Sequence, residues 1–395
     1  MEVKIIDMDH RGNGICKYNE KVCFVPKSIK DDVIDINIVK SHRKYDDGRI
    51  NKIITGSDNR VLSKCPYYNV CGGCNISNLS YDNQLMYKKN KVVNIFKRYL
   101  NMDISPRIIG SECDYKYRNK ITYHVNNGKI GLMDIDNNLL AIDSCMLVSD
   151  SVNELYKKIS LEDLSNVKKI MIKECDNGLI LSIDGKMDTK NITNLCIMIY
   201  MDNNLVYKKE DGYIYINDIK YMVNEKSFFQ VNTKNISNLY DVILEYGNFK
   251  KSDNVIDLYC GVGSISLYMA KYVNSVLGIE IIREAIDDAN NNKLINNINN
   301  AKFICGDVSK LIDDNVICDI LVVDPPRIGL DSHSADVINV SGIERIIYVS
   351  CDPMTLVRDL SRLNKYNVKD ITLVDMFPQT HHIESVVCLE KRKDN

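Results

Sequence analysis

The sequence lacks any apolar run of membrane-spanning length and any strong net charge. Residues 1–7 also lack the cationic and then apolar pattern of a secretory signal, so we expect a cytoplasmic protein that does not contact a membrane. The formal net charge of −2 gives no overall sign of a nucleic-acid partner, and no feature indicates an obligatory protein partner. At 395 residues the chain exceeds one ordinary domain, and two or three domains are expected.

Cysteine, by contrast, is plentiful. Fourteen cysteines in a reducing compartment would stay reduced, so metal, cluster or catalytic roles explain some of them better than disulfides do. Cys65, Cys71 and Cys74 have the spacing C-x5-C-x2-C, and a pair of glycines lets the backbone wrap round a bound centre. A fourth thiolate must come from elsewhere, and Cys113 and Cys145 are the nearest candidates downstream. Such a set suits an iron–sulfur cluster or a structural zinc, and the x5 spacing favours the cluster.

Positive charge is concentrated in residues 84–120. This stretch holds nine lysines and arginines against three acids, and tyrosines lie between and beside them. Cations that meet phosphates, next to rings that stack on bases, are the ingredients of an RNA-binding face. A solvated helix with ordinary surface lysines is the alternative interpretation.

Hydrophobic patterning predicts a multidomain α/β protein with three parts. Residues 1–57 contain short apolar segments between turns, which predicts a small all-β barrel. Residues 58–226 would form an α+β domain that carries the cysteine cluster. Residues 227–395 alternate apolar runs with helical segments, which predicts a doubly wound, Rossmann-like domain of the class I methyltransferase type. The expected strands are 255–259, 275–280, 302–305, 320–324, 345–350, 371–375 and 385–390.

The first of these strands runs into a glycine-containing turn. Gly261 and Gly263 allow a nucleotide-like ligand to approach the backbone closely, while Ser266 stands where a dinucleotide fingerprint has its third glycine. Glu280 ends the next strand, where a carboxylate can hold both ribose hydroxyls, and Asp307 follows the third strand, where it can accept from an adenine amine. The combination fits S-adenosylmethionine better than NAD. Ordinary turn glycines with a surface glutamate are the alternative.

Two further groups come from the same edge of the predicted sheet. Asp324 begins an Asp-Pro-Pro-Arg loop whose prolines fix the backbone, and exocyclic-amine methyltransferases carry a related loop. Cys351 follows a buried strand and precedes a helix that Asp352 can cap, so we expect the positive helix end to favour the thiolate. Cys351 is therefore a candidate nucleophile, and a small buried hydrophobic residue is the alternative.

Several motifs together resemble those of the bacterial RNA uracil-5-methyltransferases, which make 5-methyluridine in ribosomal and transfer RNA. The motifs are spread from the predicted barrel to the last strand. They are Gly12-x-Gly14-Ile15, residues 21–26, the cysteine motif of residues 65–74, residues 79–88, Tyr117-Arg118-Asn119-Lys120, Phe228-Phe229-Gln230-Val231-Asn232, Ser350-Cys351-Asp352-Pro353 and His381-His382-Ile383-Glu384.

The resemblance implies a domain arrangement, ligands and a substrate. Residues 1–57 resemble a TRAM domain, an OB-like RNA-binding module. The cluster would be a 4Fe–4S centre whose fourth ligand matches Cys145 and not Cys113. Gln230, Tyr259, Glu280 and Asp324 match positions that contact S-adenosylmethionine. The cluster-bearing branch of the family is chiefly ribosomal, so 23S rRNA is the preferred substrate and transfer RNA the alternative.

The resemblance also assigns the chemistry, with Cys351 as nucleophile and Glu384 as general base. Carbon 5 of uracil is too weak a nucleophile to take a methyl group directly, so a thiolate must first add to carbon 6. A base must then remove the carbon 5 proton. Two rival classes stand beside this interpretation. They are an amine or protein methyltransferase that uses the Asp-Pro-Pro loop, and a non-enzymatic RNA-binding or iron–sulfur sensor protein.

Overall fold

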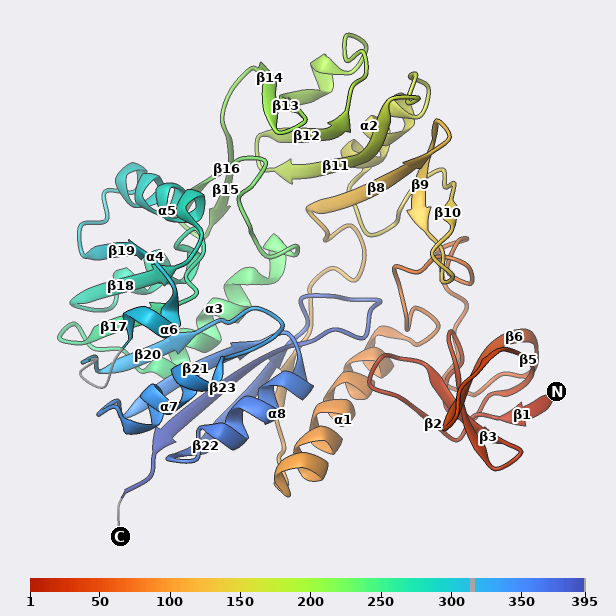
Figure 1. Ribbon diagram of the computed structural model, residues 1–395, viewed down its shortest axis with the longest axis horizontal. Coiled ribbons are helices and arrows are strands. Elements are labelled where there is room, and N and C mark those ends of the chain that lie inside the picture. The colour runs from red at the N-terminus through yellow and green to blue at the C-terminus, as the bar shows by residue number, and fades with distance from the viewer. Residues whose placement is uncertain (313–316, 394–395) are drawn as a thin grey trace.

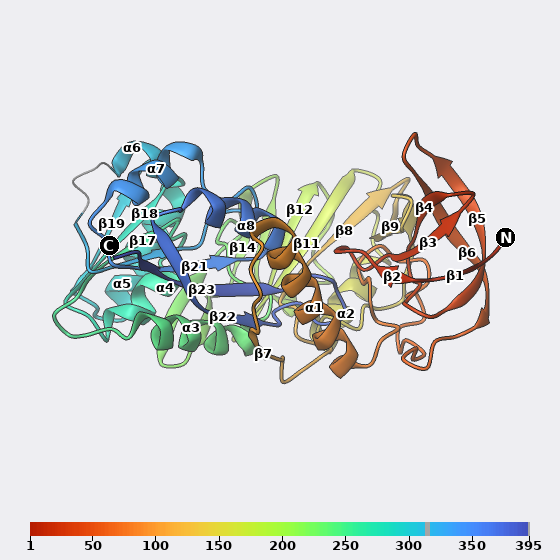
Figure 2. The same cartoon turned by 90° about the horizontal axis from the view of Figure 1, so that it is seen from below.

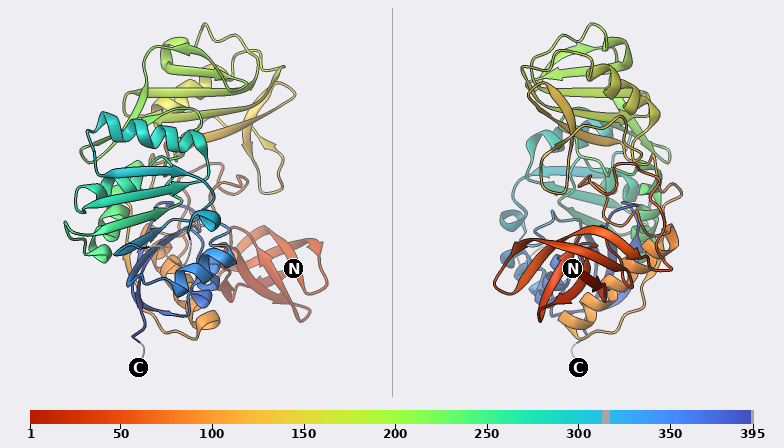
Figure 3. Two further views of the ribbon diagram at one scale, coloured as in Figure 1. Left: turned by 60° about the vertical axis from the view of Figure 1, so that its left-hand side comes forward. Right: turned by 90° about the vertical axis from the view of Figure 1, so that its right-hand side faces the viewer.

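The computed structural model describes residues 1–312 and 317–393. Three sheet-containing parts follow one another along the molecule, with the N-terminal strands at one end and the C-terminal sheet at the other (Figures 1 and 2). The central sheet lies above the C-terminal sheet in Figure 3, left, and the N-terminal part projects to one side. Within the described residues, no helix is long and apolar enough to cross a membrane.

The N-terminal part consists of paired strands and their connecting turns. Its six strands pair in the order β1-β5-β6-β4-β3-β2 around a small core that includes Ile5, Cys16, Cys23 and Ile34. The bounds are β1 (Glu2–Lys4), β2 (Asp7–Met8), β3 (Gly14–Tyr18), β4 (Lys21–Val25), β5 (Val33–Ser41) and β6 (Tyr45–Thr55). The all-β character expected for residues 1–57 is confirmed, while the assignment as a TRAM domain stays a prediction.

The central part is a seven-stranded sheet in the order β10-β9-β8-β11-β12-β13-β14. Its strands are β8 (Lys120–Asn126), β9 (Lys129–Met133), β10 (Leu139–Leu140), β11 (Val167–Cys175), β12 (Gly178–Gly185), β13 (Cys196–Met201) and β14 (Asn204–Lys208). Helix α2 (Asp150–Ile159) begins at Ser149, whose hydroxyl accepts from the backbone N–H of Val152. Its apolar stripe, which includes Leu155 and Ile159, packs into the core of this sheet.

The C-terminal sheet has the order β19-β18-β17-β20-β21-β23-β22-β7. Its strands are β17 (Asn254–Leu258), β18 (Ser275–Glu280), β19 (Ala301–Cys305), β20 (Ile320–Val323), β21 (Arg345–Ser350), β22 (Tyr366–Val374), β23 (Glu384–Lys391) and β7 (Arg107–Ile109). Only β23 runs antiparallel to its neighbours. All seven predicted strands are confirmed, and β7 is an eighth that the sequence analysis did not predict.

Helices cover both faces of the C-terminal sheet. Successive strand residues, such as Val255 and Ile256, point into two separate cores, which explains why these strands are apolar throughout. One face is covered by α3 (Thr233–Gly247), α4 (Ser264–Ala270) and α5 (Arg283–Ile295). The other is covered by α1 (Tyr81–Leu100), α6 (Val308–Leu311), α7 (Ser332–Val340) and α8 (Pro353–Arg362). Helix α1 lies between α8 and the N-terminal part (Figure 1).

Segments from before residue 227 take part in the C-terminal core. Strand β7 pairs in parallel with β22, and α1 packs on the same sheet. The hairpin of β15 (Gly212–Ile216) and β16 (Ile219–Val223) places Ile214 and Tyr221 in the core on the α3 side. The predicted domain boundaries at 57/58 and 226/227 stay predictions, and the packing ties the central segment firmly to the C-terminal sheet.

A fully buried ion pair joins α1 to the end of β22. Lys88 Nζ lies 2.6 Å from a carboxylate oxygen of Asp375 and donates to the carbonyl of Phe377 at 3.0 Å. The second carboxylate oxygen of Asp375 accepts from the Tyr81 hydroxyl at 3.0 Å. Because both charges are out of water, each depends on its partners to offset the cost of desolvation.

Removal of one partner of this ion pair should destabilise the protein strongly. Lys88→Met would leave the Asp375 carboxylate buried without its counter-charge, and we expect the free energy of unfolding to fall by about 3–5 kcal/mol. Lys89→Met is the matched control, since this neighbouring lysine is only partly buried, and its effect should stay within about 0.5 kcal/mol. Urea unfolding followed by circular dichroism measures both. Equal midpoints for the two variants would contradict a structural role for the pair.

Candidate active site

Three predicted site residues meet at one edge of the C-terminal sheet, at the carboxyl ends of β20 and β21 and the amino end of β23. In the antiparallel pair β21–β23, Ser350 lies opposite Ser385. Cys351 directly follows Ser350 and Glu384 directly precedes Ser385, so both lie next to this last pair, and the charge of Glu384 acts on Cys351. Asp324 follows β20, the parallel neighbour of β21. The structure thus brings these three side chains to one edge of the sheet, where open α/β sheets bind their ligands.

The turn after β21 is fixed by a helix cap. The Asp352 carboxylate accepts from the backbone N–H groups of Met354 at 2.8 Å and Thr355 at 3.1 Å, and Pro353 occupies the first turn of α8. The capped helix that the sequence predicts here is confirmed. Cys351 is half-buried in this turn, next to the helix N-terminus.

Burial dominates the electrostatics of the three groups. It raises the pKa of Glu384 to about 8, with a further increase from Asp324 and a decrease from the Arg327 guanidinium, and it raises the pKa of Asp324 to about 7. Burial, then the nearby Glu384 carboxylate, raises the pKa of Cys351 to about 12, and Arg327 again opposes the shift. The expectation that the helix end favours the thiolate is wrong for the free protein, because desolvation and the carboxylates outweigh one helix terminus.

The loop of residues 375–383, which leads into Glu384, is held from outside the C-terminal sheet. Gln84 of α1 donates to the Gln379 side chain at 3.0 Å, and the Gln379 backbone N–H donates to the Gln84 side chain at 2.8 Å. Backbone N–H of Asn75 donates to the Gln379 carbonyl at 3.0 Å, and the Tyr117 hydroxyl donates to a further loop carbonyl at 3.0 Å. The position of the predicted base therefore depends on the central segment.

Two histidines in this loop are neutral. The rings of His381 and His382 lie 4.0 Å apart between centroids, and burial lowers the pKa of His381 to about 2 and that of His382 to about 4. His381 Nδ1 lies 2.8 Å from the side-chain oxygen of Asn75, and the ammonium group of Lys91 donates to the His381 carbonyl. The histidines therefore orient the loop through neutral hydrogen bonds and add no positive charge to the site.

The turn after β17 has three residues in left-handed backbone conformation. These are Tyr259 with φ of 64°, Gly261 with φ of 54° and Gly263 with φ of 77°. A Cβ at Gly263 would lie 2.7 Å from the Phe303 ring, whereas one at Gly261 would meet nothing within 4 Å. The Glu280 carboxylate accepts from the Gly261 N–H at 3.2 Å. The turn is thus tied to the end of β18 and leaves open space at Gly261.

The remaining predicted cofactor residues differ in how they are held. The Gln230 carbonyl accepts from the Asn119 side chain at 3.1 Å, which places Gln230 in a segment fastened to the central part. Lys173 of β11 fastens the same segment upstream, since its buried ammonium group donates to three backbone carbonyls within residues 224–227. Asp307 caps α6, with its carboxylate accepting from the Ser309 N–H at 3.1 Å and hydroxyl at 2.8 Å.

The four predicted metal ligands line one cavity of about 350 Å³, here called the cysteine cavity. Its wall includes Cys65, Cys71, Cys74 and Cys145, whereas Cys113 does not line it. Burial, followed by the negative charge that Cys145 would carry, raises the pKa of Cys74 to about 12. Among residues 1–312 and 317–393, no group of three or more histidine, cysteine or acidic side chains is arranged to hold a single metal ion. The four thiols thus line one cavity without forming a close set of ligands for a single ion.

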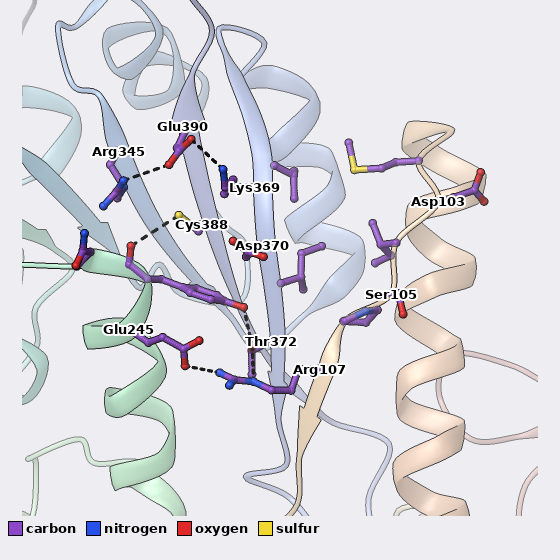
Figure 4. A pocket seen from close by; sticks show the side chains of 17 residues that line it. Asp103, Ser105, Arg107, Glu245, Arg345, Lys369, Asp370, Thr372, Cys388 and Glu390 are labelled. Atoms are coloured by element: carbon purple, nitrogen blue, oxygen red, sulfur yellow. Dashed lines mark hydrogen bonds and ion pairs between the residues drawn. The ribbon is translucent and has the colours of Figure 1, made fainter.

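A larger cavity of about 880 Å³ lies at the opposite end of the strands (Figure 4). Arg345 begins β21 and Glu390 lies near the end of β23, so this cavity is separated from Cys351 by the length of a strand. Its cations are neutralised locally, with Arg345 3.1 Å from Glu390 and Arg107 2.6 Å from Glu245. We therefore do not assign the chemistry to it.

Comparison with known proteins identifies the family. A family profile described as tRNA (Uracil-5-)-methyltransferase matches residues 197–313 and 307–392. An uncharacterised RNA methyltransferase of Halalkalibacterium halodurans is 34% identical over 449 residues, which cover 99% of this chain and 96% of that protein. This chain belongs to the RNA uracil-5-methyltransferase family. A second uncharacterised RNA methyltransferase, from Clostridium acetobutylicum, is 32% identical over 444 residues, covering 99% and 96% of the two chains. The family and the enzyme class expected from the sequence are confirmed.

A solved structure of the same type extends over the whole chain. The tRNA (uracil-54, C5)-methyltransferase of Pyrococcus abyssi, in complex with S-adenosyl-L-homocysteine, superposes with a TM-score of 0.82 and 25% sequence identity. The superposition covers 98% of this chain and 100% of that one. The mixed α/β architecture is therefore that of a uracil methyltransferase along its full length.

Sequence reasoning missed the groups that support the site. Arg327 was considered only as part of a motif, yet its charge lowers the pKa of both Cys351 and Glu384. Gln84 was likewise only part of a motif, and Lys88 was counted among the cations of the predicted RNA-binding stretch, whereas its side chain is fully buried and paired with Asp375. No signal in the nearby sequence pairs these residues with a loop almost 300 positions later. A Gln and a Lys on the apolar side of a helix would, however, justify a search for buried partners.

The raised pKa of Glu384 predicts a pH-dependent stability difference. The folded-state pKa is about 8 against an ordinary value of 4.5, so folding favours the protonated acid, and stability is lost as the pH rises through this window. Relative to Glu384→Gln, the wild type should lose about 1.4 kcal/mol per pH unit between these values. Urea unfolding at several pH values measures the difference. The exposed Glu344→Gln serves as control. Parallel curves for wild type and Glu384→Gln would contradict the shift.

Proposed function

We propose that this protein transfers a methyl group from S-adenosylmethionine to carbon 5 of a uridine in 23S rRNA, with Cys351 as nucleophile and Glu384 as general base. The observation that carries the proposal is that Cys351 and Glu384 lie beside the last residue pair of β21 and β23, where the charge of Glu384 acts on Cys351. A thiol and a carboxyl group next to each other at the ligand-binding edge of the sheet are what the two halves of this reaction require.

The chemistry needs both groups in sequence. The Cys351 thiolate adds to carbon 6 of uracil, and the electron pair of the 5,6 double bond moves to give an enolate whose carbon 5 takes the methyl group. S-adenosylmethionine, when bound, supplies that methyl group as an electrophile. The Glu384 carboxylate then removes the carbon 5 proton, the double bond re-forms, and the carbon–sulfur bond breaks to release Cys351 as the thiolate.

The electrostatics of the site suit these roles. A general base works best when its pKa lies near the working pH, and the pKa of Glu384 is about 8. At neutral pH this group is mostly protonated in the free protein, which relieves its repulsion of a thiolate at Cys351. The Arg327 guanidinium lowers the pKa of Cys351 and so favours the reactive form. A bound cation beside Cys351 would act in the same direction.

The residues proposed to hold S-adenosylmethionine surround the turn after β17. Glu280 would hold the ribose hydroxyls, Asp307 would accept from the adenine amine, and Tyr259, Gln230 and Asp324 would complete the site. The buried Glu280 already fixes the Gly261 N–H, and open space lies where a side chain at position 261 would be. The complex of the related Pyrococcus abyssi enzyme with S-adenosyl-L-homocysteine supports this ligand class.

The cysteine cavity is proposed to hold a 4Fe–4S cluster through Cys65, Cys71, Cys74 and Cys145, with zinc as the second candidate. Four thiols around about 350 Å³ suit a cluster that spans the cavity better than one ion bound by close-set ligands. Such a centre would hold the cysteine loop in place. That loop in turn contacts the 375–383 loop through Asn75, so the centre would have a structural role.

RNA is proposed to bind where the N-terminal strands meet α1. A groove of about 1020 Å³ lies there, and Tyr45, Tyr99, Arg11 and Arg98 are among the residues that line it. Exposed rings and cations together suit a single RNA strand, which supports the assignment of residues 1–57 as a TRAM domain. The target uridine would have to leave the base stack to reach Cys351. Transfer RNA is the alternative substrate, supported by the name of the Pyrococcus abyssi relative.

Trapping of the covalent intermediate tests nucleophile and substrate together. With 5-fluorouracil-substituted RNA, the base cannot remove fluorine from carbon 5, so a protein–RNA adduct should accumulate only when S-adenosylmethionine is present. Denaturing gels with ribosomal and transfer RNA show which substrate reacts. Cys351→Ala should abolish the band while cofactor binding persists. Cys318→Ala is the matched control, because this half-buried thiol lies at the amino end of β20.

The pattern of bands distinguishes the candidate functions. A band with transfer RNA alone would replace the ribosomal substrate by the alternative. No band with either RNA, from protein that binds the cofactor, would reject the nucleophilic mechanism in favour of an amine or protein methyltransferase. Protein with neither cofactor binding nor methyl transfer would indicate the non-enzymatic class.

Glu384→Gln should separate addition from elimination. Glutamine keeps the shape of the protonated acid but cannot take the carbon 5 proton, so turnover on unmodified RNA should fall by at least about 100-fold, while the adduct on Cys351 persists. Single-turnover assays with denaturing gels follow both species. Rapid release of methylated RNA by Glu384→Gln would remove Glu384 from the role of base.

A further inference from the structure

Lys27, at the end of the N-terminal sheet, has an unusual environment. It follows β4 and has a left-handed backbone with φ of 64°, a conformation that is strained for a residue with a side chain. Its carbonyl accepts from Arg60 at 3.0 Å and from Asn78 at 2.8 Å, which hold the backbone in place. A strained residue that its surroundings fix so completely indicates that its side chain has a specific task.

The side chain of Lys27 ends at the cysteine loop. Its ammonium group donates to the carbonyl of Cys71 at 2.9 Å and to the carbonyl of Cys74, and it lies 4.4 Å from the centre of the Tyr68 ring. The residue is only 7% exposed. Within residues 1–312 and 317–393, no aspartate or glutamate oxygen lies within 4.0 Å of this ammonium group.

The contacts of this buried ammonium group are two carbonyls and an aromatic ring, all of them neutral, so a negative charge nearby would stabilise it further. The thiols of the cysteine cavity are the candidates, because the two carbonyls belong to Cys71 and Cys74, which line that cavity. Neutral thiols would leave the cation uncompensated. Four thiolates around a metal ion or cluster carry more negative charge than the metal supplies positive charge, and the centre as a whole is an anion.

We propose that Lys27 is the counter-cation of the metal–thiolate centre and that it fastens the N-terminal strands to that centre. The inference rests on the proposed occupancy of the cysteine cavity, and it goes beyond it by assigning a partner outside the four ligands. Lys27 belongs to the N-terminal part and the ligands belong to the central part. Loss of the centre would therefore weaken the attachment of the N-terminal strands to the rest of the protein.

Metal release measures the contribution of Lys27 directly. The experiment uses anaerobically purified protein whose metal and sulfide content has been measured. The transfer of metal to a chelator should be about 10- to 100-fold faster for Lys27→Met than for wild type, because residues that contact the ligands contribute to metal affinity by this factor. Lys27→Arg keeps the charge and should restore most of the retention. Lys30→Met removes an exposed positive charge nearby and should release metal at the wild-type rate.

A glycine variant separates charge from backbone strain. Lys27→Gly suits the left-handed backbone and still removes the ammonium group, so it should relieve the backbone strain and still lose metal faster. For an iron–sulfur occupant, the midpoint potential of either uncharged variant should be more negative, because reduction adds negative charge that Lys27 no longer offsets. Hydrogen exchange of residues 21–29 should increase in both.

The outcomes distinguish this inference from the proposal on which it rests. Wild-type protein without bound iron or zinc would overturn the metal centre and the role of Lys27 together. Metal-bearing wild type with unchanged release rates in Lys27→Met and Lys27→Gly would overturn the role of Lys27 alone and leave the centre in place. Faster release in Lys30→Met to the same extent would also overturn it, since the effect would then not depend on the buried position.

Discussion

The buried ion pair between Lys88 and Asp375 is the interaction on which the arrangement of the site depends. Asp375 follows the last residue of β22 and begins the loop that leads to Glu384, while Lys88 belongs to a helix almost 290 residues earlier. Because neither group has access to water, all of their hydrogen bonds must come from protein: Asp375 also accepts from the Tyr81 hydroxyl and from the Phe377 N–H at 3.1 Å. These requirements leave one geometry for the start of the loop, and Glu384 takes its position from it.

Desolvation also determines the pKa values of the groups at the candidate site. Glu384 and Asp324 share a buried edge of the sheet, where each raises the cost of ionising its neighbours. Elsewhere in a protein such a pair would only reduce stability. Here it gives a carboxyl group with a pKa of about 8 beside a thiol whose pKa is about 12, so both groups favour their neutral forms more than they would in water. The burial of these ionisable groups reduces the stability of the protein, and the packing of the surrounding elements offsets this loss.

Patterns in the local sequence predicted the strands and the helix cap correctly, but not which distant residues these elements contact. The apolar runs predicted all seven strands of the C-terminal sheet, and Asp352 with Pro353 predicted the cap of α8, because these signals lie within a few residues. Strand β7 is three residues long and pairs with a strand more than 260 positions later, so no periodicity marks it. The thiolate expectation at Cys351 was wrong for the same reason, since the burial of its side chain and the approach of Glu384 arise only through the fold.

Four buried lysines have the same structural role. Lys27, Lys88, Lys91 and Lys173 each cross from one segment to another and donate to backbone carbonyls of a loop: the cysteine loop, the two sides of the 375–383 loop and the segment before Gln230. A long chain with three donors can satisfy several carbonyls that no regular structure pairs. The loops that carry the proposed ligands, base and cofactor contact are therefore each anchored by a neighbouring part of the chain. The positions of these loops therefore depend on contacts between parts of the chain that are far apart in the sequence.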